Sequence, residues 1–276
     1  MSSPFDQIQE EDLRRVEQIK PSYSSPHNGS LFSPDIILVA QKMVAEAIGT
    51  FFIVFAGCGS VILNKKDGTI TFPGICIIWG SIVMVMVYSL GHVSGGHFNP
   101  AVTTAFTLLK RFPFKELPFY VCAQMIGSIL ASGVLFLLLD PKPIQFFGTV
   151  PAGTAMQSFC MEFIITFLLM FNVCSVGTDD RAIGELGGIV VGSTILLNVF
   201  VGGPISGASM NPARSIGPAI IMHNFKDIWV YIVGPVIGAV AGGFVYNFLR
   251  FVEEPPKETI KNDSFFNGNT SRNDIC

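Results

Sequence analysis

The sequence predicts an all-α membrane protein with six transmembrane helices, two re-entrant half-helices and an inverted repeat of three plus three spans. The first observation behind this prediction is composition. Of the 276 residues, 50% are hydrophobic and only 13% are charged, about half the charged share of a soluble domain. The second is the charge pattern, in which charged residues fall between long uncharged runs. The third is an Asn-Pro-Ala triplet that occurs in each half of the chain.

Charge and cysteine usage exclude two other classes of protein. The net charge of −3 comes without a basic block, which argues against nucleic acid as a partner. Five of the six cysteines lie in apolar runs and Cys276 is terminal. Buried small hydrophobic side chains are therefore expected, not a disulfide framework. With a mean hydropathy of +0.54, the chain is expected to be an integral membrane protein.

Six uncharged runs have the length of a membrane span. A helix needs about 20 apolar residues to cross the hydrocarbon core, within a range of roughly 17–25. No signal peptide precedes the first run, so the first span is expected to act as the insertion signal. The runs predict spans near residues 43–64, 74–93, 117–139, 155–176, 186–204 and 228–250.

Two further apolar segments, residues 94–109 and 206–221, are too short to cross the membrane. Each opens with Ser-Gly and contains one Asn-Pro-Ala triplet. An ordinary loop is the alternative interpretation, but a loop would not stay apolar for a dozen residues after its turn. We therefore expect re-entrant half-helices, which are tolerated at membrane depth inside protein or along a water-filled cavity.

The polar ends set the domain boundaries and the orientation. Residues 1–42 and 252–276 are expected to be disordered tails, flanking a membrane domain over 43–251 with repeats at about 43–139 and 155–251. Six spans place both tails on one side, which then holds 12 of the 17 Lys and Arg residues against 4 on the other. The positive-inside rule therefore predicts that both termini are cytoplasmic.

The two halves of the membrane domain resemble each other. Residues 94–101 match residues 206–213 at an offset of 112, and residues 46–51 match residues 162–167 at an offset of 116. Because each half has three spans, an odd number, the second half must enter the membrane from the opposite face. Repeats of this kind place the functional site near the midplane, where broken helices from both halves meet.

Each Asn-Pro-Ala triplet is typical of a helix start. Asn is a strong N-cap, Pro is favoured at the first helical position, and a helix N-terminus has about half a positive charge. Two short helices are therefore expected to meet N-terminus to N-terminus at the bilayer centre. If each Asn oxygen caps its helix, the amide NH2 is left to donate to the oxygen of a passing neutral molecule. The triplets are Asn99, Pro100, Ala101 and Asn211, Pro212, Ala213.

Four further polar residues stand out within the apolar segments. Arg214 follows the second triplet, and a charge at this depth is expected to face a water-filled cavity, where it would repel cations and protons. Glu46 and Glu162 are the acids well inside spans. They could relay protons in a transporter, or accept backbone N–H bonds that the re-entrant loops leave unpaired, which their matched positions favour. His97 has no second His or Cys at ligand spacing, so a hydrogen-bonded loop histidine is expected and no metal site.

The doubled motif SGGHFNPAV and SGASMNPARS resembles the major intrinsic protein family, the aquaporins, over about residues 43–251. The resemblance implies an aquaporin-like fold, a passive channel and not an enzyme, no cofactor, and a homotetramer with one pore per subunit. It also implies a multi-pass protein of the plasma membrane, with an internal membrane as the alternative.

The resemblance also implies a narrow ring of four residues near the extracellular mouth, at Trp79, Val199, Ala208 and Arg214. Strict water channels typically have Phe and His at the first two positions. Trp and Val there resemble the first subgroup of the plant nodulin-26-like proteins, and they suit a small polyol whose carbons contact the apolar wall. Ser215 is the residue of water channels at its position, so water permeation is expected as well.

The sequence therefore predicts a passive channel for small uncharged solutes that excludes protons and ions. Water and glycerol-like polyols are the expected cargo, while ammonia, urea, hydrogen peroxide and metalloid acids stay open. An ion-coupled secondary transporter of a small solute is the alternative, and a membrane enzyme is disfavoured because no nucleophile motif is present. Ser264, three residues after Lys261, is a candidate site for a kinase acting on the C-terminal tail.

Overall fold

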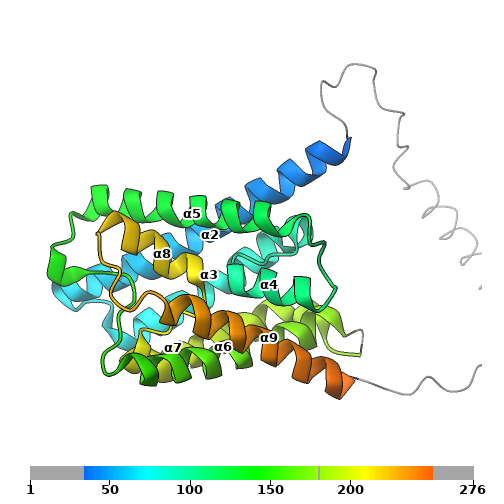
Figure 1. Ribbon diagram of the computed structural model, residues 1–276. Coiled ribbons are helices and arrows are strands. Elements are labelled where there is room, and N and C mark those ends of the chain that lie inside the picture. Colours follow the sequence, from blue (N-terminus) through cyan, green and yellow to red (C-terminus); the bar gives the residue numbers. More distant parts are fainter. Residues whose placement is uncertain (1–33, 180, 251–276) are drawn as a thin grey trace, which may run out of the picture.

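The computed structural model describes residues 34–179 and 181–250, and within them it contains six helices long and apolar enough to cross a membrane. The six run side by side, and two shorter helices, α4 and α8, lie between them (Figure 1). The predicted fold class is confirmed. The long helices are α2 (Pro34–Asp67), α3 (Thr71–Ser94), α5 (Leu117–Leu139), α6 (Ala155–Thr178), α7 (Gly187–Ser206) and α9 (Val230–Arg250); the short ones are α4 (Pro100–Leu108) and α8 (Pro212–Ile221), with 3-10 turns η1 (Pro143–Gln145) and η2 (Gly184–Leu186).

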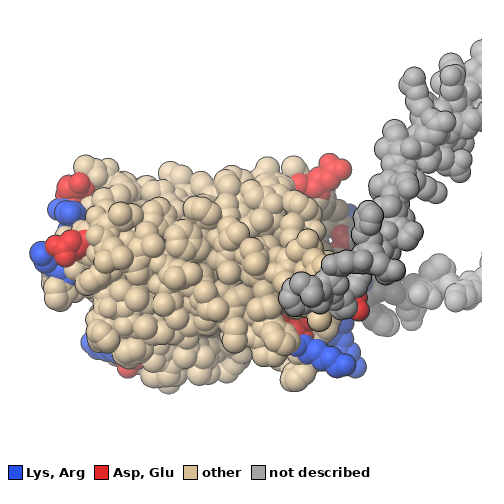
Figure 2. Space-filling model, turned by 90° about the horizontal axis from the view of Figure 1, so that it is seen from above, with Lys and Arg blue, Asp and Glu red and all other residues tan. Residues whose placement is uncertain are grey.

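Charged side chains gather at the two ends of the helix bundle. On the face seen in Figure 2, Lys, Arg, Asp and Glu lie at these ends, and an uncharged band separates them. Large apolar side chains are exposed on several long helices, such as Leu137 on α5 and Ile164 on α6. Such a surface fits the hydrocarbon core of a bilayer, with the charges at the two water interfaces.

The first helix is longer than the sequence predicts. Because α2 begins at Pro34, residues 34–42 are helical, and the expectation of a disordered tail is wrong there. Asp35 lies in the first turn of α2, where an acid is favoured by the helix dipole. Further along, Lys42 Nζ forms an ion pair with Glu116 Oε2 at 3.1 Å, which ties the extension to the start of α5. The rest of both expected tails, and Ser264, lie outside the described residues.

Glycines allow the same close helix crossing in both repeats. A Cβ atom at Gly127 of α5 would overlap the carbonyl oxygen of Ala47 on α2, and one at Gly238 of α9 would overlap that of Phe163 on α6. These pairs lie at equivalent positions of the two halves, in agreement with the internal repeat. Contacts through small residues let helix backbones approach closely where no hydrophobic effect drives them together.

A third glycine contact joins the two repeats. A Cβ atom at Gly80 of α3 would lie 2.6 Å from the carbonyl oxygen of Gly192 on α7, and one at Gly192 would lie 2.6 Å from that of Gly80. The obstacle in each case is backbone, which cannot move aside without shifting a whole helix. The α3–α7 contact therefore requires glycine on both sides.

We expect Gly80→Ala to lower the free energy of unfolding by about 1–3 kcal/mol, as overpacking typically does. The measurement is unfolding of the purified protein in mixed detergent micelles. Gly177→Ala on α6 is the matched control, since a Cβ atom there meets nothing within 4 Å and alanine favours the helix. If both variants unfold like the unchanged protein, the α3–α7 contact is looser than described.

Candidate pore

Both Asn-Pro-Ala triplets begin a short helix, as predicted. Asn99 caps α4 and its Oδ1 accepts a hydrogen bond from the Ala101 N–H at 2.9 Å. Asn211 caps α8 and its Oδ1 accepts from the N–H groups of Ala213 at 3.0 Å and Arg214 at 3.4 Å. The proline after each Asn occupies the first turn, where its missing N–H leaves no donor unpaired.

The amide groups of the two capping residues cross from one repeat to the other. Asn99 Nδ2 donates to the carbonyl of Met210 at 2.7 Å, and Asn211 Nδ2 donates to the carbonyl of Phe98 at 2.9 Å. The expectation that each NH2 is wholly free is therefore wrong. Because an amide nitrogen has two hydrogens, one N–H of each side chain remains for a ligand.

Glu46 satisfies the interrupted backbone of the first re-entrant segment. Its Oε1 accepts from the His97 N–H at 2.9 Å and the Ser94 hydroxyl at 2.7 Å, and its Oε2 accepts from the Phe98 N–H at 2.7 Å. Phe98 has φ = 48°, a left-handed conformation that costs a residue with a side chain roughly 1–2 kcal/mol. The fully buried carboxylate compensates by pairing the N–H groups that this turn exposes.

Glu162 makes the equivalent bonds in the second repeat. Its Oε1 accepts from the Ser209 N–H at 2.8 Å and the Ser206 hydroxyl at 2.7 Å, while its Oε2 accepts from the Met210 N–H at 2.7 Å. Met210 has φ = 53° and Glu162 is fully buried. Each glutamate therefore binds the segment of its own repeat, and neither faces the other.

Two tyrosines that the sequence analysis missed also belong to this frame. Tyr120 of α5 donates its hydroxyl to the carbonyl of Ser94, and Tyr231 of α9 donates to that of Ser206, both at 2.7 Å. These carbonyls end α3 and α7, where the helix leaves its last oxygens unpaired. The two tyrosines are 111 residues apart, close to the offset of 112 between the triplets, and this was the signal in the sequence that could have found them.

His97 lies in a hydrogen-bonded network particular to the first repeat. Its Nδ1 is 3.2 Å from Thr103 Oγ1, and Gln124 Nε2 donates to both Thr103 Oγ1 at 3.0 Å and Glu46 Oε2 at 2.8 Å. In the described part of the chain, no three His, Cys, Asp or Glu residues are grouped so that they could hold a metal ion. The imidazole therefore joins the frame of the first segment.

The second repeat replaces this network by three hydroxyl groups. Pro235 stands where the first repeat has Gln124. Ser215 Oγ lies 2.6 Å from Ser209 Oγ and 2.7 Å from Thr149 Oγ1. Since Thr149 belongs to the connection between α5 and α6, these bonds fix that connection against the start of α8.

A cavity of about 490 Å³ runs along the meeting point of the two segments. It brings together the four residues of the predicted ring and the two capping asparagines, and His97 also lines it. The prolines and alanines of the triplets are buried in the first turns of α4 and α8. Apolar walls with a few convergent polar groups are typical of a small-molecule site. The shared lining residues are Trp79, Val199, Ala208, Arg214, Asn99 and Asn211.

Among the four residues of the ring, Arg214 is the one that has a charged side chain. Its side chain has no ion-pair partner in the described residues, and Nε and Nη1 have no hydrogen-bond acceptor. Its Cζ lies 4.9 Å from the centre of the Trp79 ring, a cation–π contact. A buried donor without an acceptor costs about 1–3 kcal/mol or more, and Nε and Nη1 are enclosed by protein. Arg214 also lines the cavity, where its positive charge favours an oxygen-bearing ligand.

The model of the family described as Major intrinsic protein matches residues 35–246. The chain belongs to this family. It is 57% identical to the "Probable aquaporin NIP-type" of Nicotiana alata, covering 93% of this chain and 96% of the relative. It is 56% identical to "Nodulin-26" of Glycine max, covering 83% and 84%. The fold is similar to the structure of the aquaglyceroporin from Plasmodium falciparum, with a TM-score of 0.70, 23% identity and coverage of 76% and 96%.

This major intrinsic protein supports its ring positions with residues that the sequence analysis did not single out for that purpose. A Cβ atom at Gly57 of α2 would overlap the Trp79 indole, so glycine is needed at this position for the indole to lie there. Asn198 Nδ2 donates to the Ile165 carbonyl at 2.7 Å, which ties α7 to α6 beside Val199. The local sequence held no signal for these contacts, because each joins helices far apart along the chain.

We expect Glu162→Gln to lower the free energy of unfolding by about 1–3 kcal/mol, because the added NH2 would face backbone N–H donors and leave one of them unpaired. Unfolding in mixed micelles measures the change. Glu116→Gln is the control, since it removes only the partly exposed ion pair with Lys42, worth at most about 1 kcal/mol. Equal losses in the two variants would contradict a supporting role for Glu162.

Proposed function

We propose that this chain, a passive membrane channel for water and small uncharged solutes, conducts glycerol-sized polyols as well as water. The observation that carries the proposal is the cavity whose lining combines the Arg214 guanidinium with the apolar side chains of Trp79 and Val199. A polyol has hydroxyl oxygens along one edge and carbons along the other. Such a solute fits a passage that is polar on one side and apolar on the other.

The ring composition decides between water and larger solutes. Histidine at position 199 would add a second polar wall and narrow the passage, whereas Val199 leaves it wider and apolar. Trp79 is held against Gly57 and beneath the Arg214 guanidinium, so its broad face is fixed. A fixed apolar wall beside a cationic hydrogen-bond donor favours solutes that can present both kinds of surface at once.

The same geometry favours exclusion of cations and protons from the passage. Arg214 and the N-termini of α4 and α8 place positive charge along the passage, which repels cations and protons. The remaining N–H of Asn99 and of Asn211 would donate to the oxygen of each passing molecule. A water oxygen that accepts there cannot also continue the chain of hydrogen bonds along which a proton moves.

An ion-coupled transporter is not favoured by the acids in the spans. Glu46 and Glu162 each accept bonds from a hydroxyl and two backbone N–H groups, and neither lines the cavity. A proton relay needs a carboxylate that can exchange protons with the passage. We propose that both residues support the re-entrant segments.

The remaining features of the proposal concern assembly and location. The family consists of channels for small neutral solutes that usually form tetramers, and we propose a homotetramer in the plasma membrane with both termini cytoplasmic. We also propose that the chain has no catalytic activity and needs no cofactor. Phosphorylation of Ser264 by a kinase stays a prediction from the sequence.

The ring can be tested by making it resemble that of a strict water channel. We expect Trp79→Phe combined with Val199→His to abolish glycerol permeation and to spare or raise water permeation, because the ring gains a donor and becomes narrower. Stopped-flow swelling of proteoliposomes measures both. The control is Trp229→Phe, because Trp229 is the second tryptophan of the chain and does not line the cavity. Unchanged glycerol flux in the double variant would show that the ring lies elsewhere.

Charge exclusion can be tested at the arginine. We expect Arg214→Val to weaken exclusion of cations without abolishing it, because the backbone dipoles of α4 and α8 remain. Voltage clamp of expressing oocytes, with swelling assays beside it, measures current and water flux together. Lys226→Val, an exposed residue outside the cavity lining, is the control. A current in the unchanged protein that rises with expression and with acid would contradict the passive channel and support an ion-coupled transporter.

A further inference from the structure

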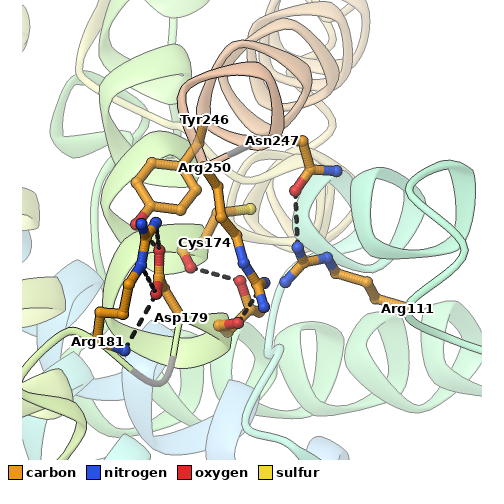
Figure 3. Close-up of polar contacts among 8 residues, drawn as sticks. Arg111, Cys174, Asp179, Arg181, Tyr246, Asn247 and Arg250 are labelled. Atoms are coloured by element: carbon orange, nitrogen blue, oxygen red, sulfur yellow. Dashed lines mark hydrogen bonds and ion pairs between the residues drawn. The ribbon is translucent and has the colours of Figure 1, made fainter. Parts of the chain in front are cut away.

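A second polar cluster lies at the end of the bundle where α6 and α9 finish (Figure 3). Part of it is a closed ion pair. Arg181 donates from Nε and Nη2 to the two Asp179 oxygens at 2.9 and 2.8 Å, and the Tyr246 hydroxyl donates to Oδ2 at 2.8 Å. The Arg181 guanidinium first, and then the Tyr246 hydroxyl, hold the pKa of the Asp179 carboxyl well below its usual range. Both carboxylate oxygens of Asp179 therefore already accept hydrogen bonds, and its side chain is only 4% exposed.

Two other guanidinium groups in this cluster have no such partner in the part of the chain that the structure describes. Arg111, between α4 and α5, donates from Nη2 to Asn247 Oδ1 at 2.7 Å. Arg250, at the end of α9, donates from Nη1 to the carbonyl of Thr178. Both bonds use neutral acceptors, and neither arginine forms an ion pair within the described residues.

The two groups are also close to each other. Asn247 and Arg250 are three residues apart on α9 and so share one face of that helix. Figure 3 shows the Arg111 and Arg250 side chains converging beside Cys174, and both act on that side chain electrostatically. Neither lines the cavity of the pore.

Structural roles account for only part of this arrangement. Arg250 places a positive charge at the C-terminal end of α6, where the helix dipole favours it, and Arg111 ties its loop to α9. Each role uses one nitrogen of a guanidinium that has five N–H donors. Two neighbouring cations without a counter-ion among the described residues repel each other, so an anion that binds both is favoured.

We propose that Arg111 and Arg250 form a binding site for a phosphomonoester group, such as the headgroup of an anionic lipid. Guanidinium groups bind phosphate through paired N–H···O bonds, and basic pockets between membrane helices bind phosphorylated headgroups. Exposed apolar side chains follow on the same helix, with Phe248 79% and Leu249 60% exposed. They mark the lipid-facing side of α9 within one turn of Arg250, close to where lipid headgroups lie.

The test measures binding to the full-length protein in neutral detergent. The probes are dioctanoyl phosphatidylinositol 4-phosphate, dioctanoyl phosphatidylcholine, inositol 1,4-bisphosphate and inorganic phosphate, with native mass spectrometry and ligand-induced thermal shift as readouts. We expect the phosphoinositide to bind and the phosphatidylcholine not to bind. Arg111→Gln and Arg250→Gln should each weaken binding about fivefold, the effect of one basic residue near an anionic surface.

Lys115→Gln is the matched control, because Lys115 is exposed in the same α4–α5 connection and forms no ion pair within the described residues. It should change binding less than twofold. Binding of the soluble probes as tight as that of the lipid would identify an anion from solution at the same site, whereas preference for the lipid identifies the bilayer as the source.

Three results would overturn the proposal. One is that none of the phosphate-bearing probes binds. Another is that the double Arg→Gln variant binds as tightly as the unchanged protein, and the third is that Lys115→Gln loses as much as either arginine variant. Melting without ligand reports whether each variant folds. If the glutamine variants do not fold, Arg111→Lys with Arg250→Lys keeps both charges without the planar fork. That pair should bind less tightly than the unchanged protein, and equal binding would equally count against the site.

Discussion

The hydrogen bonds from two buried carboxylates to interrupted backbone are the constraint on which the pore depends. A helix that begins at mid-membrane, and the loop that leads into it, expose N–H groups in a place where no bulk water can bind them, and each unsatisfied group costs several kcal/mol. Glu46 and Glu162 each pair two of these N–H groups and one hydroxyl. Only with these donors paired can Asn99 and Asn211 cap α4 and α8 at the centre.

The position of the free charge follows from that frame. Arg214 lies in the first turn of α8, so the turn held by Glu162 also determines where its guanidinium points. The chain leaves two nitrogens of this buried cation without acceptors while it saturates the buried acids. A neutral molecule with oxygen atoms can accept from Arg214 where that residue lines the cavity, whereas a cation meets repulsion and no acceptor. One arrangement therefore attracts one class of solute and rejects another.

The sequence predicted the fold because bilayer thickness restricts helix length and because the repeat is visible in the motifs. It also predicted which residues meet at the cavity, through the two triplets and the resemblance they support. The sequence did not predict contacts whose partners lie on other helices. The crossed bonds of Asn99 and Asn211, the tyrosine bonds to Ser94 and Ser206, and the start of α2 at Pro34 all depend on contacts between segments far apart in the chain. Local patterns contain no information about the acceptor at such a distance.

The crossed amide bonds obey the rule of an isologous dimer interface. Asn99 and Asn211 are equivalent positions of the two repeats, and so are Phe98 and Met210. The bond from Asn99 to the Met210 carbonyl is thus the two-fold image of the bond from Asn211 to the Phe98 carbonyl, as expected when residue i of one unit contacts residue j of the other and the reverse. Two copies of a single three-span unit, inserted in opposite orientations, could form the same pair of bonds without any covalent link between them.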